Sequence, residues 1–173
     1  MVARSRGVDI LAQGSGNPGA SNVARVLGSQ WGVLVFLLDA LKGAMPALAG
    51  LAVDTRPGAY VLVSAAVLGH MFPATRRFRG GKGVATMAGA MLVLHPLMWL
   101  VLLAVWMIVR KITGKASLAS LAITIGLPIG LAVSGVRAWE IVYVVALCVL
   151  VLARHTDNIK RLLMRRELSA HRP

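Results

Sequence analysis

Three segments rich in glycine and basic residues contain most of the side chains suited to binding anions. They are GSGNPGASNVAR (14–25), GHMFPATRRFRGGKG (69–83) and RHTDNIKRLLMRRE (154–167). Cationic, amide and hydroxyl groups all hydrogen-bond anions, and glycine lets a ligand come close to the backbone. The residue types therefore indicate sites for phosphorylated groups.

The second segment has the most specific pattern. Gly80, Gly81 and Gly83 surround Lys82, and an apolar segment begins directly afterwards. We expect the glycine N–H groups to be free to face an anion, while Lys82 adds a positive charge at a helix N-terminus. The pattern predicts an anion-binding loop.

The first segment begins with GSGNPG, which matches the G-x-G-x-x-G pattern of dinucleotide-binding loops. That pattern requires a strand before it and a βαβ unit around it, whereas a long apolar run follows here. We instead expect Ser15 and Asn17 to hydrogen-bond a ligand and the planar guanidinium of Arg25 to bind a phosphate. The segment can also cap a short following helix through Ser21 or Asn22, and the two roles are compatible.

The third segment places His155 and Asn158 three positions apart, and therefore on one face of a helix. A single histidine is more often structural than functional. Here Arg154 and Arg161 flank it, which makes a functional role a serious alternative.

The composition predicts a membrane protein. Of the 173 residues, 57% are hydrophobic and only 14% are charged, with a mean hydropathy of +0.74. A soluble domain is less apolar and more charged. The net charge of +13 does not indicate a nucleic-acid-binding protein, because the basic residues lie between apolar runs and form no soluble basic face.

The apolar segments lie at 31–52, 58–72, 84–109, 117–135 and 138–153. Helices are expected for all of them, because a backbone that spans a bilayer must satisfy its own hydrogen bonds. The segment 84–109 is ambiguous, since His95 and Pro96 lie near its middle and proline disfavours a continuous helix. It forms either one tilted span or a hairpin of two short helices, 84–94 and 97–111.

The basic residues distinguish these two topologies. With the hairpin, all 19 Lys and Arg residues except Arg56, Arg137 and Lys42 fall on one side of the membrane, including Arg172 near the end of the chain. Positive charge accumulates on the cytoplasmic side of membrane proteins. We therefore predict an all-α polytopic bundle of six membrane helices in one domain (residues 1–173), with both termini and all three polar segments cytoplasmic.

Three anion-binding segments at one end of a helical bundle predict a site for two phosphorylated groups beside a lipid-accessible groove. The sequence offers no carboxylate pair, no metal-binding cluster and no evident nucleophile with its base. Any reaction must then depend on positioning and electrostatics, with a substrate that brings its own leaving group. Asp39 and Lys42, inside the first apolar run, are expected to neutralise each other.

The three segments resemble, in order and spacing, the three motifs of the bacterial acyl-phosphate-dependent glycerol-3-phosphate acyltransferases, the PlsY-type enzymes. The resemblance extends from about Gly7 to Glu167. It implies transfer of an acyl group from acyl phosphate to the 1-hydroxyl of glycerol-3-phosphate, which yields lysophosphatidic acid and phosphate in the first step of phospholipid synthesis. It also implies an inner-membrane location, lipid and phosphate-ester partners, and no metal or cofactor.

The resemblance assigns roles to matching positions. The residues it implies for catalysis are Ser15, Lys82, His155 and Asn158, and those for substrate binding are Asn17, Arg25, Gly80, Gly81, Gly83 and, more weakly, Ser120. Glu167 is expected to be structural. The proton of the glycerol hydroxyl goes either to His155 or to a substrate phosphate oxygen.

Two alternatives stay open at this point. A small anion or phosphate-ester transporter would also point helix ends at anions, but its sites would lie near the membrane midplane and an internal repeat is expected. A purely structural subunit would not need a glycine-flanked lysine. In addition, family members begin with a further apolar span, whereas this sequence opens with MVARSRGVDILAQ, so six helices are expected in place of seven.

Overall fold

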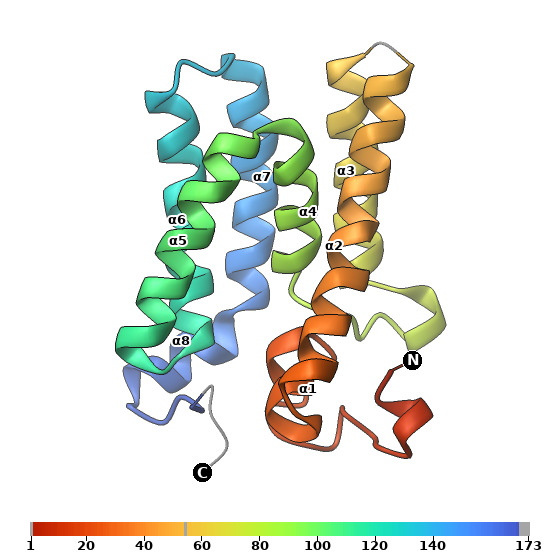
Figure 1. Cartoon of the computed structure of the whole chain (residues 1–173), viewed down its shortest axis with the longest axis vertical. Coiled ribbons are helices and arrows are strands. Elements are labelled where there is room, and N and C mark those ends of the chain that lie inside the picture. Colours follow the sequence, from red (N-terminus) through yellow and green to blue (C-terminus); the bar gives the residue numbers. More distant parts are fainter. Residues whose placement is uncertain (1, 54, 170–173) are drawn as a thin grey trace.

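The protein is an all-helical bundle (Figure 1). The structure is a computed structural model that describes residues 2–53 and 55–169. Arg172 lies outside the described residues. The α-helices are α1 (Ala20–Leu27), α2 (Ser29–Ala52), α3 (Arg56–Met71), α4 (Val84–Leu94), α5 (Pro96–Thr113), α6 (Ala116–Val133), α7 (Ala138–Arg154) and α8 (Thr156–Leu163), with short 3-10 turns at Arg4–Arg6 and Ala74–Arg76. The described chain contains no β-strand, and the predicted all-α class is confirmed.

The ambiguous apolar segment is a hairpin. Helix α4 ends at Leu94, His95 adopts a non-helical φ of −144°, and Pro96 begins α5. Proline fits this first helical position because its missing N–H would have no partner there. With 11 residues α4 is about 16 Å long, which is too short to cross a bilayer alone.

Four helices of the described chain are long and apolar enough to span a membrane: Ser29–Ala52, Arg56–Arg76, Pro96–Thr113 and Ala116–Val133. Helices α7 and α8, bent by 58°, together form a fifth candidate. Six apolar helices therefore occur at the predicted positions, but α4 is not a full-length span.

The hairpin places the three polar segments at one end of the bundle. In Figure 1, α1, the loop between α3 and α4, the turn between α5 and α6, and α8 lie toward the lower end. At the opposite end, Arg56 begins α3 and Arg137 directly precedes α7. Among the described residues, the basic segments therefore lie at one end of the bundle, as the sequence predicted.

Close contact between α2 and α4 depends on two glycines. A methyl group on Gly43 would overlap the Thr86 carbonyl oxygen, and one on Gly89 would overlap that of Ala40. Small residues let membrane helices approach until their backbones touch. This contact fixes α4, and the loop that precedes it, against α2.

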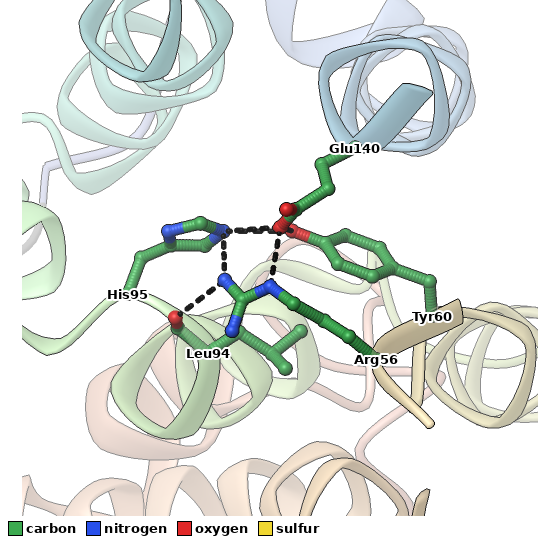
Figure 2. Close-up of polar contacts among 5 residues, drawn as sticks. All are labelled: Arg56, Tyr60, Leu94, His95 and Glu140. Carbon is green, nitrogen blue, oxygen red and sulfur yellow. Dashed lines mark hydrogen bonds and ion pairs between the residues drawn. The ribbon is translucent and has the colours of Figure 1, made fainter. Parts of the chain in front are cut away.

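A buried polar cluster joins helices at the end opposite the polar segments (Figure 2). Glu140 Oε2 accepts hydrogen bonds from Arg56 Nε at 2.8 Å and from the Tyr60 hydroxyl at 2.9 Å. The Tyr60 hydroxyl oxygen also lies 2.7 Å from His95 Nε2. Arg56 also donates to the Leu94 carbonyl at 3.1 Å. The cluster, not predicted from the sequence, ties α3 and α7 to the end of α4.

Candidate active site

The three polar segments meet in one cavity of about 130 Å³. All the predicted site residues except Gly80 and Gly81 line it: Ser15, Asn17, Arg25, Lys82, Gly83, Ser120, His155 and Asn158. We call this cavity the polar pocket. The tertiary structure thus assembles residues from the loop before α1, from α1, the α3–α4 loop, α6 and the α7–α8 junction.

Lys82 is held in the polar pocket by Asn158. Lys82 Nζ donates to Asn158 Oδ1, and Asn158 Nδ2 donates to Glu167 Oε1 at 2.7 Å. Arg161 Nε binds the other Glu167 oxygen at 2.9 Å, which agrees with the structural role expected for Glu167. Burial and then the charge of Arg161 lower the pKa of Lys82 to about 8.

The glycine loop does not form the predicted anion nest at Gly80 and Gly81. Their N–H groups donate to the carbonyls of Met71 and His70, each at 3.2 Å. The last carbonyls of a helix lack partners within the helix, and the loop folds back to satisfy them at the end of α3. Only Gly83, with a φ of 87° directly before α4, lies at the polar pocket.

Asn22 organises the first motif but does not cap α1. The N-cap is Gly19, which has no side-chain cap, so the predicted cap at Ser21 or Asn22 is wrong. Asn22 is buried, and its Oδ1 accepts from the Ser15 N–H (2.9 Å) and Arg25 Nη1 (3.1 Å). These hydrogen bonds hold the preceding loop against α1 and bring Ser15 close to Arg25.

His155 lies at the break between α7 and α8 and is only 2% exposed. Its Nδ1 is 2.8 Å from the Val151 carbonyl, an acceptor, so Nδ1 carries the proton and Nε2 keeps its lone pair. Burial lowers the pKa of His155 to about 4. The residue is therefore a neutral imidazole with one basic nitrogen near neutral pH.

Asp39 and His70 line the polar pocket as well, although the sequence analysis gave them no role in the site. Asp39 Oδ1 is 2.6 Å from Lys42 Nζ, which confirms the predicted pairing, and 3.5 Å from His70 Nδ1. On its other side His70 lies against Gly81, where an added methyl group would overlap Nε2. A carboxylate inside an apolar helix is the signal that could have identified this pair.

Ser120 lines the polar pocket, but its hydroxyl already has protein partners. It donates to the Ala116 carbonyl at 2.9 Å and accepts from Trp106 Nε1 at 3.3 Å.

Within the described chain no group of three His, Cys, Asp or Glu side chains is arranged to hold a metal ion.

An apolar groove adjoins the polar pocket. This cavity of about 330 Å³ runs between α2, α4, α5 and α6. The groove and the polar pocket share the lining residues Ala20, Ser21, Phe36, Val84, Trp106 and Ala116. The arrangement suits a molecule with an anionic head and a hydrocarbon chain.

The family described as "Glycerol-3-phosphate acyltransferase" matches residues 1–165 of this sequence. The chain belongs to this family. Among glycerol-3-phosphate acyltransferases, the protein from Aquifex aeolicus (strain VF5) is 40% identical over 96% of this chain and 88% of its own length. That from Clostridioides difficile (strain 630) is 44% identical over 94% of this chain and 82% of its own length.

Two solved structures of PlsY, an integral membrane glycerol 3-phosphate acyltransferase, share the fold. The glycerol 3-phosphate form superposes with a TM-score of 0.90, and the lysophosphatidic acid form with 0.87. Both proteins are 40% identical to this sequence. Each match covers 97% of this chain and 85% of the chain in the solved structure. The acyltransferase family and its integral membrane bundle, as expected from the three motifs, are confirmed.

Proposed function

We propose that this protein transfers a fatty acyl group from acyl phosphate to the 1-hydroxyl of glycerol-3-phosphate, which yields lysophosphatidic acid and phosphate. The observation that supports it most directly is the junction of a cationic polar pocket with an apolar groove. One substrate is a small phosphate ester and the other an acyl chain with an anionic head. The two cavities match these two chemistries.

The charges around the polar pocket favour anions. Its two carboxylates are each bound by a cation, Asp39 by Lys42 and Glu167 by Arg161. Lys82 and Arg25 also line the pocket. In this proposal Lys82 and Arg25 bind the phosphate groups, while Ser15, Asn17 and Asn158 orient the glycerol.

The reaction requires little from the protein beyond positioning. The glycerol hydroxyl oxygen attacks the acyl carbonyl carbon, the bond from this carbon to the phosphate oxygen breaks, and phosphate leaves with the electron pair. The hydroxyl proton passes to His155 Nε2 or to a phosphate oxygen. Cationic groups in the polar pocket reduce the repulsion between two anionic reactants.

The orientation of the bundle follows from its charge. Arg154, Lys160, Arg161 and the basic α3–α4 loop lie at the end that contains the polar pocket. From the bias of basic residues toward the cytoplasm we infer that this end faces the cytoplasm. In this proposal the membrane is the cell's inner membrane. Both substrates would then reach the site from the cytoplasm or the inner leaflet, as the first step of phospholipid synthesis requires.

The decisive experiment gives the purified protein radiolabelled glycerol-3-phosphate with palmitoyl phosphate or, in parallel, palmitoyl-CoA. We expect lysophosphatidic acid from palmitoyl phosphate alone. Product from the thioester would identify a different donor. No product from folded protein with either donor would exclude the acyltransferase proposal.

A further inference from the structure

Arg110 is the only charged residue among the described residues that line the apolar groove. It lies on α5, one turn after Trp106, and its guanidinium carbon is 5.3 Å from the centroid of the Trp106 ring. The Arg110 Nε atom is buried and has no hydrogen-bond partner within the described part of the chain. A cation therefore borders a cavity that is otherwise built for hydrocarbon.

No carboxylate of the described residues forms an ion pair with Arg110. The ion pairs there involve Lys42, Arg56, His70, His95 and Arg161. A buried donor without a partner costs free energy, and an anionic ligand would remove that cost. The guanidinium also presents several parallel N–H groups that match the oxygens of a phosphate.

The contact with Trp106 places Arg110 near the junction of the groove and the polar pocket. Trp106 lines both cavities, and its Nε1 donates to Ser120 Oγ at 3.3 Å. Ala116, at the start of α6, also lines both cavities. A lipid head that moves between the polar pocket and the groove must pass this junction.

We propose that Arg110 binds the phosphate of a single-chain lipid whose hydrocarbon lies in the apolar groove. Two such lipids fit: the acyl phosphate as it enters, or lysophosphatidic acid as it leaves. The assignment of these lipids rests on the proposed function. Arg110 is thus a substrate- or product-binding residue outside the three motifs.

Lys111 provides a matched control. It is the next residue, carries the same charge, is exposed, and lines neither cavity. If Arg110 only anchored the end of α5 in the lipid head groups, loss of either charge would have a similar effect.

The first experiment measures steady-state kinetics of Arg110→Gln, Arg110→Lys and Lys111→Gln in lipid vesicles. We expect Arg110→Gln to raise KM for palmitoyl phosphate about tenfold, since one hydrogen bond to a charged group is lost. Lys111→Gln should stay within about twofold of the wild type, and KM for glycerol-3-phosphate should change in neither variant. Arg110→Lys should recover part of the loss.

The second experiment measures binding of lysophosphatidic acid and of uncharged monoacylglycerol with the same chain. Arg110→Gln should weaken lysophosphatidic acid binding about tenfold and leave monoacylglycerol binding unchanged, because only the former has a phosphate. A change in KM alone assigns the contact to the donor, and a change in lysophosphatidic acid binding alone assigns it to the product.

The inference is overturned if Arg110→Gln and Lys111→Gln behave alike in both experiments, or if Arg110→Lys is as defective as Arg110→Gln. Binding is measured without turnover. An inactive wild type would therefore count against the proposed reaction, while the comparison of Arg110→Gln with wild-type binding would still decide on the phosphate contact.

Discussion

Lys82 Nζ donates a hydrogen bond to Asn158 Oδ1, although the two residues lie 76 positions apart in the chain. The amide of Asn158 is fixed at its other end by Glu167, which accepts from Nδ2 at 2.7 Å. The second and third motifs are thus connected through one side chain, and the direction of the lysine depends on it.

Replacement of Asn158 by alanine should reduce kcat/KM about 100-fold, because Lys82 loses the partner that aims it into the polar pocket. Lys160→Gln is the control, since Lys160 is exposed on the same helix, α8. We expect it to stay within about twofold of the wild type. Steady-state kinetics decide, and equal losses in the two variants would contradict a specific role for Asn158.

The pKa of Lys82, lowered to about 8 by burial and Arg161, predicts a fall of activity in alkali. The charged form binds phosphate, so kcat/KM for glycerol-3-phosphate should be full below pH 8 and decrease as the pH rises through 8. Lys82→Arg stays protonated throughout, and its activity, though lower, should lack this decrease. Identical alkaline profiles for the two proteins would show that another group titrates.

His155→Gln separates the two candidate proton acceptors. If Nε2 is the base, kcat should fall about 100-fold or more, because general base catalysis contributes this much. Since burial lowers the pKa of His155 to about 4, the wild type should show no acid limb from this residue above about pH 5. Near-normal turnover with an unchanged pH profile would instead assign the proton to a substrate phosphate.

The same substitution at His95 is the control for His155, because His95 lies in the polar cluster at the opposite end of the bundle. We expect His95→Gln to lower Tm while kcat of the folded protein stays within about twofold of the wild type.

Gly81→Ala tests whether the close contact between Gly81 and His70 sets the position of the loop that contains Lys82. The new methyl group would overlap His70 Nε2, so the loop must move and kcat/KM should fall about tenfold or more. Gly69→Ala is the control, since nothing lies within 4 Å of a methyl group there. In the double variant Gly81→Ala/His70→Ala, where the imidazole is gone, part of the activity should return. No recovery would mean that Gly81 acts on the site by another route.

Arg56→Gln should lower the free energy of unfolding by about 2 kcal/mol, because Glu140 stays buried while losing its cation. Arg137→Gln removes an exposed charge at the same end of the bundle and should have little effect. The double variant Arg56→Gln/Glu140→Gln should be more stable than Arg56→Gln alone. Thermal unfolding in detergent provides the comparison, and equal Tm values for the two single variants would contradict a stabilising role for the cluster.

The sequence by itself determined the helical membrane class, the hairpin at His95 and Pro96, and the distribution of charge. Each follows from local chemistry: a spanning backbone must bond to itself, proline begins a helix but interrupts one in its interior, and basic residues collect on one side. Eight of the ten site residues predicted from the sequence also line the polar pocket, and most of these eight belong to the three polar segments.

Only the tertiary structure decided which partners those residues meet. The N–H groups of Gly80 and Gly81 bind the end of α3, Asn22 folds a loop in place of capping a helix, and Asp39 reaches His70 as well as Lys42. Arg110 lines the apolar groove because α5 borders this cavity together with α2, α4 and α6. Such contacts depend on how separate helices pack, and spacing along one helix does not contain that information.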